Sequence, residues 1–455
     1  MRNILIIGAG RSTTSLIRYL IEKSSSENLF ITIGDISLES AQKLTNNHPN
    51  AKGILLDVFN KKQREEAVKA VDIVISMLPA RFHIEVAKDC VTYEKNLVTA
   101  SYISDEMQAL NKEVVEKGLV FMNEIGVDPG IDHMSAMQVI DTIRDKGGKL
   151  ILFESFTGGL IAPESDDNLW NYKFTWNPRN VVLAGQGGAA EFLQEGLHKY
   201  IPYNRLFRRT ELIKIKGYGE FEVYANRNSL KYQKVYGFKD ILTLYRGTIR
   251  RVGFSRAWNI FVQLGMTDDS YTIPNSENLS YREYVNLFLP YSPTDSIELK
   301  LRHNLKIDQD DLIWKKLKEI DIFNSKKYLE IKNASPAQAL QKILMEKWAL
   351  AKDDKDMIVM YHKFGYELNG KNYQIDSSMV TVGEDQTYTA MSKTVGLPVA
   401  IAALKILNKT ITTPGVLRPI DKEVYKPILK ELETYGVEFN EQKKEYLGYN
   451  PDKLD

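Results

Sequence analysis

The chain has 455 residues, which is too long for one compact core and indicates two or three domains. Hydrophobic residues make up 43% and charged residues 26%, a globular balance rather than that of a disordered or membrane-embedded protein. The formal net charge of +1 excludes a global field that would attract nucleic acid or an acidic membrane, so local arginines must hold any anionic ligand.

The cysteine and histidine content argues against a disulfide-stabilised protein and against a metal-binding protein. The single cysteine, Cys90, rules out an intramolecular disulfide and fits a reducing compartment. The six histidines are dispersed without ligand-type spacing, so no metal site is expected. The opening apolar run, residues 4–7, is shorter than a signal-peptide core, and no later run approaches the ~20 apolar residues of a bilayer span. We therefore expect a cytoplasmic protein that contacts neither membrane nor nucleic acid.

The first ~125 residues alternate short apolar runs with amphipathic stretches, as βαβ units do. The runs lack strict alternation, which is typical of parallel strands covered on both faces. The expected strands are residues 3–7, 29–33, 53–56, 72–77, 96–100 and 119–124. The expected helices are residues 15–23, 38–45, 62–71, 83–92 and 104–117. This pattern predicts an α/β fold with a Rossmann-type doubly wound parallel sheet over residues 1–127.

The pattern of apolar residues changes near residue 149. Runs at 150–156, 221–225 and 357–361 mix aromatic and β-branched residues, which predicts a second, partly antiparallel sheet in an α+β domain over residues 128–388. Residues from about 255 to 350 are mainly helical in pattern and read as a helical insertion, with helices at 310–318 and 336–348. A C-terminal segment, 389–455, opens with an apolar-faced helix at 390–407.

A glycine turn after the first strand is the cofactor signal. Gly8 permits a tight turn, and Gly10 lets the backbone approach a pyrophosphate at the start of the first helix. Arg11 and Ser12 follow on the same turn and are expected to bind the cofactor. The third position is Thr13 instead of Gly or Ala, which should loosen the contact between helix and strand.

The ends of the next strands carry side chains suited to a dinucleotide. Asp35 closes the second strand, where a carboxylate would accept hydrogen bonds from the adenosine ribose. Asp57 ends the third strand near the adenine, and Leu78 follows the fourth, where strand order reverses. A carboxylate at position 35 would repel a 2′-phosphate, so NAD is expected to be preferred over NADP, although Arg11 could stack on adenine or reach a phosphate.

An ordered series of blocks then carries a family resemblance. The blocks lie at residues 98–102, 123–133, 158–164, 172–176, 225–229, 245–250 and 390–398, and they include Asp-Pro-Gly-Ile-Asp-His and Arg-Gly-Thr. In this order they closely resemble the glutamate-forming saccharopine dehydrogenases (saccharopine reductases), which also form the second half of aminoadipic semialdehyde synthase. The resemblance runs from the first strand to about Pro427, and only the helical insertion looks divergent.

The resemblance implies an NAD(P)-dependent oxidoreductase that acts on the CH–NH group of saccharopine in lysine metabolism. Oxidation and hydrolysis would give L-glutamate and aminoadipic semialdehyde, and the reverse reaction would make saccharopine. It also implies a homodimer through the substrate-binding second domain and a C-terminal segment that returns to the nucleotide domain.

The same resemblance assigns roles to residues in the blocks. Ser101 and Tyr102 would contact saccharopine, with Tyr102 relaying a proton beside the amine; a tyrosine packed at a domain seam is the alternative. Val127, Asp128 and Pro129 would face the nicotinamide, with Asp128 as a proton-handling candidate. Asp128 also reads as a helix N-cap with Pro129 at the first helical position. His133, one turn further on, is expected to be a packed, hydrogen-bonded residue.

Arginines supply the expected carboxylate clamps, because a guanidinium matches a carboxylate in a bidentate fork. The resemblance implies that Arg227, Gly247 and Thr248 contact saccharopine, and Thr175 belongs to the cofactor set. Arg250, with Arg246 behind it, is a further clamp candidate, and an interdomain ion pair is the alternative role.

Two positions depart from the family pattern. Thr157 stands where the family usually has cysteine, which excludes an essential thiol there, and Asn228 stands where it usually has aspartate. Two alternatives stay open: a related carboxynorspermidine- or homospermidine-type dehydrogenase on the same scaffold, and an inert nucleotide-binding regulator.

Overall fold

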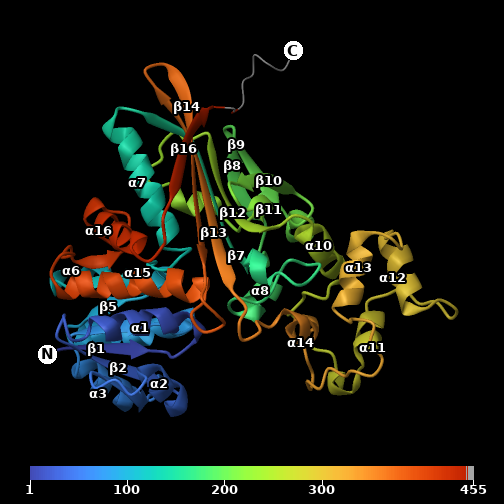
Figure 1. Cartoon of the computed structure of the whole chain (residues 1–455), viewed down its shortest axis with the longest axis horizontal. Helices are drawn as coiled ribbons and strands as arrows, with labels where there is room; N and C mark the ends of the chain where they lie inside the picture. Colours follow the sequence, from blue (N-terminus) through green and yellow to red (C-terminus); the bar gives the residue numbers. More distant parts are fainter. Residues whose placement is uncertain (447, 449–455) are drawn as a thin grey trace. The chain divides into compact units, whose positions relative to one another are not determined.

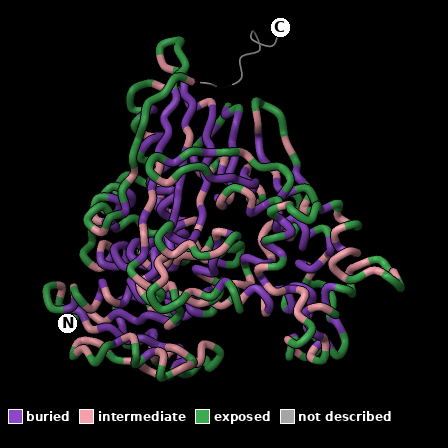
Figure 2. Tube along the Cα trace, turned by 45° about the vertical axis from the view of Figure 1, so that its right-hand side comes forward, coloured by how far each residue is buried: buried purple, intermediate pink, exposed green. Residues whose placement is uncertain are grey.

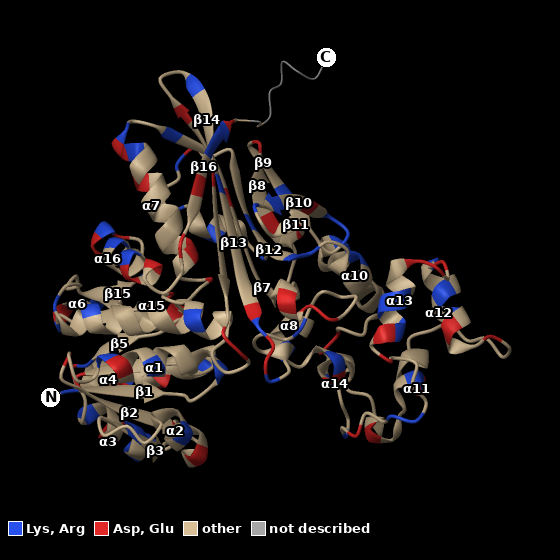
Figure 3. Ribbon diagram, viewed as in Figure 1, with Lys and Arg blue, Asp and Glu red and all other residues tan. Residues whose placement is uncertain are grey.

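A computed structural model describes residues 1–446 and 448. Packing divides the chain into two units. Figure 1 colours the chain along its sequence, from the N-terminus in blue to the C-terminus in red. Unit 1 comprises Met1–Lys149, Leu368–Lys371 and Met379–Gln442, and unit 2 comprises Leu150–Glu367, Asn372–Ser378 and the described residues from Lys443 onward. Figure 3 shows charged residues of both signs on the elements of each unit, in keeping with the small net charge.

Unit 1 contains a seven-stranded parallel sheet in the order β15-β6-β5-β4-β1-β2-β3. Its strands are β1 (Arg2–Ile7), β2 (Leu29–Asp35), β3 (Ala51–Leu55), β4 (Ile73–Ser76), β5 (Asn96–Val98), β6 (Val120–Met122) and β15 (Gly415–Leu417). The order reverses between β1 and β4, as in a doubly wound sheet. Residues 4–7 of β1 are all buried, because helices cover both faces of the sheet.

The helices of unit 1 follow the predicted pattern closely. They are α1 (Thr14–Lys23), α2 (Leu38–Thr45), α3 (Lys61–Lys69), α4 (His83–Thr92), α5 (Asp105–Ala109), α6 (Asn111–Glu116), α7 (Ile131–Asp145), α15 (Ala390–Leu407) and α16 (Lys422–Glu433). The single helix expected at 104–117 is divided into α5 and α6 at Leu110. The Rossmann-type α/β class predicted from the sequence is therefore confirmed.

The C-terminal part of unit 1 packs on its first helix. Helix α15 lies against α1, and the Ser15 and Ser392 hydroxyls are 2.7 Å apart. A Cβ on Gly396 would lie 2.9 Å from the Leu16 backbone nitrogen, so only glycine allows this approach. By length and composition α15 could cross a bilayer, a segment that the sequence analysis did not expect. However, 78% of it is buried inside the protein, as the purple trace in Figure 2 illustrates for the core.

The units do not coincide with the boundaries drawn at residues 128 and 389. Helix α7 belongs to unit 1 because it packs against α16, where the Tyr425 hydroxyl donates to Asp141 (2.8 Å) and Lys422 pairs with Asp145 (2.9 Å). Residues 379–388 also belong to unit 1. Sequence periodicity locates helices but does not show which neighbour buries each apolar face.

Unit 2 is built on a mixed nine-stranded sheet with the main order β10-β11-β12-β7-β13-β14-β16, and β8 pairs with β12 and β9. The strands are β7 (Lys149–Ile161), β8 (Ala190–Gln194), β9 (Leu197–Ile201), β10 (Thr210–Ile215), β11 (Gly219–Ala225), β12 (Thr243–Arg251), β13 (Asp356–Leu368), β14 (Lys371–Val382) and β16 (Asn440–Glu445). Strands β12 and β7 run parallel, whereas β10, β11 and β12 pair antiparallel.

Residues 254–348 form the helical part of unit 2, as the sequence pattern predicts. The helices of unit 2 are α8 (Pro178–Val182), α9 (Tyr203–Leu206), α10 (Phe254–Leu264), α11 (Tyr281–Asn286), α12 (Ile297–Leu305), α13 (Leu312–Glu319) and α14 (Pro336–Trp348). Ser335 and Gln338 form a capping box at the start of α14. An aromatic core joins α10 and α14 to the segment after β7, with Trp170, Tyr172, Phe254 and Trp348 in mutual ring contact.

Candidate functional site

The glycine turn of unit 1 has the geometry that a dinucleotide phosphate needs. Gly8 has φ +109°, and a Cβ there would lie 2.9 Å from the Met77 carbonyl oxygen. A Cβ on Gly10 would meet nothing within 4 Å, so a ligand can approach this backbone. The Thr13 hydroxyl is buried and donates to the Gly10 carbonyl at 2.7 Å. Thr13 therefore braces the turn itself, and the expected loosening of the contact between helix and strand stays a prediction.

Asp35 ends β2 as predicted, but its carboxylate is engaged by backbone groups. One oxygen accepts the Ala9 N–H at 2.7 Å, and the other accepts the Ser37 N–H at 2.8 Å. Asp35 thus ties the glycine turn to the start of α2. Arg11 is exposed on the turn, Ser12 is half-buried beside it, and the Arg11 guanidinium has no hydrogen bond or ion pair with any described residue. The expected preference for NAD requires the Asp35 carboxylate to face the ribose, and here each of its oxygens already accepts a backbone hydrogen bond.

The two other strand-end residues also have local partners. Asp57 follows β3, accepts the Phe59 N–H at 2.9 Å, and donates its own N–H to the Gln63 side chain at 3.2 Å. Leu78 follows β4 and packs against the apolar core between the sheet and its helices. Both lie at the carboxyl end of the sheet, where the prediction put them.

Ser101 and Tyr102 follow β5 at this edge. Tyr102 is 46% exposed, so it is available to a ligand. The Ser101 hydroxyl is 2.7 Å from Nε2 of His83, the first residue of α4, and His83 Nδ1 is 2.8 Å from the Ser76 hydroxyl at the end of β4. His83 is buried, and desolvation lowers its pKa to about 4. In the sequence His83 is only one of six dispersed histidines, and no periodicity marks it.

The loop at Asp128 corrects one prediction. Helix α7 begins at Ile131 with Gly130 as its N-cap residue, so Asp128 is not the cap and Pro129 is not the first helical residue. The reason is a tight backbone turn: the Gly126 N–H donates to the Pro129 carbonyl at 2.8 Å, and Gly130 has φ +147°. The Asp128–Pro129 peptide bond is cis. Val127 is buried in the turn, and Asp128 is half-buried.

A buried acid next to this turn was missed by the sequence analysis. Glu124 is buried with φ +52°, and its carboxylate contacts His133 Nε2 (3.0 Å), Arg418 Nε (2.9 Å) and the Ile103 N–H (3.1 Å). Burial alone would raise the pKa of Glu124, but the hydrogen bond with His133 and the charge of Arg418 outweigh it and lower the pKa. His133 is thus packed and hydrogen-bonded, as expected. Glu124 holds the loop that carries Ser101 and Tyr102.

In unit 2, three central strands place the predicted clamp residues on one face. Thr248 of β12 is paired with Thr157 of β7 on one side and with Tyr224 of β11 on the other. Because alternate residues share a face, Arg246, Thr248 and Arg250 project to the same side of β12. Gly247 lies between them, and a Cβ there would be 2.9 Å from the Tyr224 carbonyl oxygen. Gly247 is buried and has no side chain, so it can offer a ligand only its backbone groups.

Arg250 is a buried cation surrounded by rings. Its side chain is 4% exposed, and its guanidinium carbon lies 5.1 Å from the ring centre of Tyr172, 5.4 Å from Phe254 and 5.8 Å from Tyr224. Nη1 donates to the Ile249 carbonyl at 2.9 Å. Within residues 1–446 and 448, Arg250 has no carboxylate partner and its Nε has no acceptor. The expected alternative for Arg250, an interdomain ion pair, has no support among these residues.

Other buried polar atoms of unit 2 also lack partners. The hydroxyls of Thr157, Tyr172 and Thr175 are buried, and none has a hydrogen bond within the described part of the chain. Burial raises the pKa of Tyr172 to about 12 although the Arg250 charge opposes this. Buried groups in this state usually receive a partner from a ligand or water. The predicted cofactor residue Thr175 and the departure Thr157 are therefore buried polar groups of unit 2 that a ligand could pair.

Arg227 lies just beyond β11 in an unusual backbone conformation. Its φ is +45°, which is uncommon outside glycine, and its side chain is exposed. The next residue explains one departure from the family pattern. The Asn228 amide donates to the Glu191 carboxylate at 2.5 Å, and its oxygen accepts the Leu230 N–H at 2.8 Å. An ionised aspartate at this position would repel Glu191.

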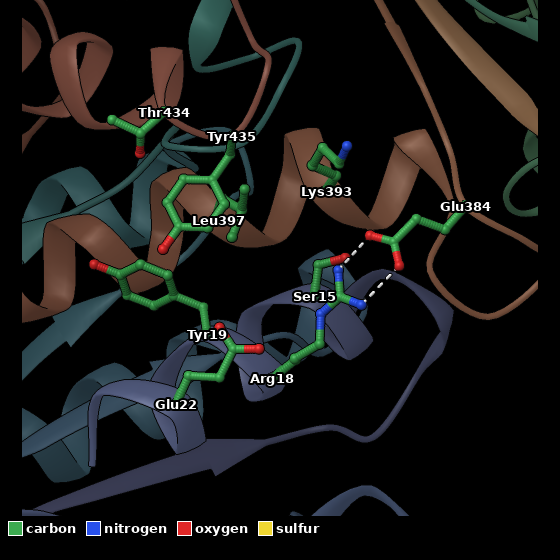
Figure 4. A pocket seen from close by; sticks show the side chains of 9 residues that line it. All are labelled: Ser15, Arg18, Tyr19, Glu22, Glu384, Lys393, Leu397, Thr434 and Tyr435. Carbon is green, nitrogen blue, oxygen red and sulfur yellow. Dashed lines mark hydrogen bonds and ion pairs between the residues drawn. The ribbon is translucent and has the colours of Figure 1, made fainter. Parts of the chain in front are cut away.

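A pocket of about 330 Å³ lies between α1, α15 and the end of α16 within unit 1 (Figure 4). Two of its charged side chains pair: Arg18 makes two hydrogen bonds to Glu384, at 2.8 and 2.6 Å, and stacks on Tyr388. The Tyr19 hydroxyl donates to Glu431 at 2.5 Å. These contacts fasten the C-terminal segment to α1. No group of three or more histidine, cysteine or acidic side chains in the described ranges could hold a metal ion.

Two family models match the chain. Residues 4–122 match the saccharopine dehydrogenase NADP binding domain, and residues 126–437 match the saccharopine dehydrogenase C-terminal domain. The chain is 32% identical to the saccharopine dehydrogenase [NADP(+), L-glutamate-forming] of Schizosaccharomyces pombe, over 97% of this chain and 99% of that protein. It is 33% identical to the mouse mitochondrial alpha-aminoadipic semialdehyde synthase, over 97% of this chain and 48% of that protein.

Comparison with solved structures points to the same family. The apo L-Glu-forming saccharopine dehydrogenase from Saccharomyces cerevisiae has a TM-score of 0.89 and 31% identity, and the likeness covers 98% of this chain and all of that one. A Legionella pneumophila homospermidine synthase shares only the fold, with a TM-score of 0.52 and 11% identity. A nicotinamide cofactor is thus confirmed, but the names of the relatives favour NADP over the expected NAD. The chain belongs to the saccharopine dehydrogenase family of oxidoreductases.

Proposed function

We propose that this chain is an L-glutamate-forming saccharopine dehydrogenase of lysine metabolism. It would oxidise saccharopine to L-glutamate and aminoadipic semialdehyde, or catalyse the reverse reduction. The observation that carries this proposal is the match along almost the whole length to fungal enzymes of that name. The open backbone at Gly10 and the unpaired buried cation Arg250 fit a dinucleotide and a polycarboxylate, respectively.

The glycine turn would hold the phosphates of a nicotinamide dinucleotide, which would supply a hydride acceptor for the substrate carbon. The chain's own residues then have four tasks. Arg227 and Arg250 grip carboxylates, because a guanidinium donates two parallel hydrogen bonds to such a group. Ser101 binds the substrate, and the Tyr102 hydroxyl hydrogen-bonds the reacting amine. The Asp128 carboxylate accepts the proton that leaves the amine nitrogen.

The proposed cofactor preference rests on the two backbone hydrogen bonds that the Asp35 carboxylate accepts. We propose that NADP is preferred and that Arg11 contacts its 2′-phosphate, because the Arg11 guanidinium is exposed on the turn and the Asp35 carboxylate is tied to Ala9 and Ser37. Arg11→Ala should lower kcat/KM for NADP about 10-fold or more, as expected for a charge-assisted contact, and change kcat/KM for NAD little. Arg11→Lys, which keeps the charge, is the matched control. A wild-type advantage for NAD would refute this preference.

Steady-state kinetics test the function itself. Saccharopine should be turned over with NADP, and carboxynorspermidine-type amines should not be. Arg227→Ala should raise KM for saccharopine about 10- to 100-fold, as for the loss of a charge-assisted bidentate contact, and leave KM for NADP nearly unchanged. Arg208→Ala, an exposed arginine in the same unit, should behave as wild type. Tight NADP binding without turnover of any such amine would favour an inert regulator.

Three further expectations rest on the sequence and remain proposals. A homodimer through unit 2 would appear as twice the chain mass in analytical ultracentrifugation. A cytoplasmic, membrane-free protein would stay in the soluble fraction of lysed cells, in keeping with its single cysteine. Thr157 would leave activity insensitive to thiol reagents, because the substrate site then contains no thiol at this position.

A further inference from the structure

A chain of hydrogen bonds links the ends of β4 and β5 through a buried imidazole. His83 Nδ1 is 2.8 Å from the Ser76 hydroxyl, and Nε2 is 2.7 Å from the Ser101 hydroxyl. The Thr99 hydroxyl is 3.4 Å from the same Nε2 and also accepts the Ser101 N–H at 3.3 Å. These groups all lie in unit 1, at the sheet edge where the glycine turn also lies.

The His83 imidazole is neutral at the near-neutral pH at which enzymes usually work. Desolvation is what lowers the pKa of His83, and the histidine has no ion-pair partner among the described residues. A neutral imidazole has one N–H donor and one lone pair, so the two serine hydroxyls must play opposite roles. One serine donates to the ring, and the other accepts from it.

The buried hydroxyls decide which nitrogen holds the proton. His83 is the hydrogen-bond partner of the Ser76 hydroxyl within residues 1–446 and 448, so a proton on Nδ1 would leave the Ser76 O–H without an acceptor. The lone pair on Nε2 could then not accept from both Ser101 and Thr99. With the proton on Nε2, Ser76 donates to Nδ1 and Nε2–H donates to Ser101. This arrangement pairs the proton of the buried Ser76 hydroxyl and leaves free that of Ser101, which is only half-buried, and an unpaired proton costs more where it is buried.

We propose that His83 is a positioning residue of the reaction: as the Nε2–H tautomer it fixes the Ser101 oxygen and turns the Ser101 hydroxyl proton toward a carboxylate of the substrate. The proposal rests on the proposed function, in which Ser101 contacts saccharopine. It assigns Ser101 a donor role toward an anionic oxygen, and it gives the buried Ser76 hydroxyl the role of setting the tautomer.

A double-mutant cycle tests whether His83 acts through Ser101. His83→Ala should raise KM for saccharopine about 10-fold, the equivalent of one hydrogen bond to a charged acceptor, and leave KM for NADP unchanged. In a Ser101→Ala background the same substitution should have almost no further effect. His83→Gln, whose amide can still donate to Ser101, should restore most of the loss. His48→Ala, another histidine of unit 1, should keep wild-type KM values.

Nitrogen NMR of the holoenzyme gives a readout that does not depend on turnover. The His83 signals should show the neutral Nε2–H tautomer from pH 5.5 to pH 9 in wild type, because about 4 is the expected pKa. Ser76→Ala, which keeps His83 in place, should allow the other tautomer and raise KM for saccharopine. A neutral Nδ1–H ring in wild type, or equal effects of His83→Ala with and without the Ser101 hydroxyl, would overturn the proposal. A wild-type enzyme that fails to oxidise saccharopine would refute the proposed function, while the NMR result would still decide the tautomer.

Discussion

Removal of the Glu124 carboxylate should destabilise unit 1 strongly. The side chain is buried and contacts His133, Arg418 and the Ile103 N–H at 2.9–3.1 Å. Arg418 is 27% exposed and can be solvated, but His133 and the Ile103 N–H would be left in a dry site. Breaking a buried pair of this kind costs about 3–5 kcal/mol, a large share of the roughly 5–15 kcal/mol that stabilises a typical folded domain. Glu124→Ala should lower the stability of unit 1 by this amount.

The chain offers a separate probe for each unit. All five tryptophans lie in unit 2, whereas the single cysteine, Cys90, is buried in the core of unit 1. Burial raises the pKa of the Cys90 thiol, so it reacts with dithiodipyridine only when unit 1 opens. With a urea m-value of about 3 kcal/mol/M, Glu124→Ala should shift the Cys90 midpoint down by about 1 M or more. The tryptophan fluorescence midpoint should move much less.

Glycine at the same position provides the control for backbone strain. Glu124 has φ +52°, a conformation that glycine adopts at no steric cost and that alanine does not. Glu124→Gly loses the same carboxylate as Glu124→Ala, yet it should be more stable by about 1 kcal/mol. Alanine normally stabilises a chain relative to glycine, so the expected order is reversed. A Cys90 midpoint that is unchanged in Glu124→Ala, or a glycine variant less stable than the alanine variant, would refute the reasoning.

Four further outcomes are expected. Glu124 has a lowered pKa, so its stabilisation is present above the unfolded value of about 4.3 and is lost as pH falls through the folded pKa; Glu124→Gln should abolish this part of the acid dependence of the Cys90 midpoint. Gly396→Ala should push α15 from α1 and cost about 1–3 kcal/mol in the same assay. Tyr102→Phe should lower kcat and shift its pH profile without changing stability, since the residue is exposed. Arg250→Met should raise KM for saccharopine yet leave the tryptophan midpoint at or above that of wild type, because an unpaired buried charge is removed.

Much of unit 1 could be predicted because its signals are local. Continuous apolar runs mark the strands, and the Gly8–Gly10 turn marks the phosphate edge. Strand β15 could not be predicted in this way, because its three residues gain their place only by pairing with β6, about 300 residues earlier in the chain. The contacts between α7 and α16 that place α7 in unit 1 could not be predicted for the same reason.

The site residues show the same difference between local sequence signals and contacts that form only in the fold. Gly8, Asp35 and Ser101 lie at strand ends as predicted, because such positions can be counted from the sequence. Glu124 and His83 were missed, because their roles arise from hydrogen bonds across neighbouring strands and, for Glu124, from a backbone angle that no residue pattern reveals. The N-cap reading of Asp128 failed because the turn between Gly126 and Gly130 delays the helix. Capping rules describe side chains and do not include such a backbone turn.

The unpaired polar groups of unit 2 connect stability with ligand binding. Arg250 Nε and the hydroxyls of Tyr172 and Thr175 are buried without partners in the described chain, and each unsatisfied group costs about 1–3 kcal/mol. A fold keeps such groups where a ligand supplies the missing partners. A carboxylate bound at Arg250 would recover part of that cost, so substrate affinity there comes from relieving a penalty already present in the free protein. Arg250→Met should therefore separate the two properties, with stability retained and affinity lost.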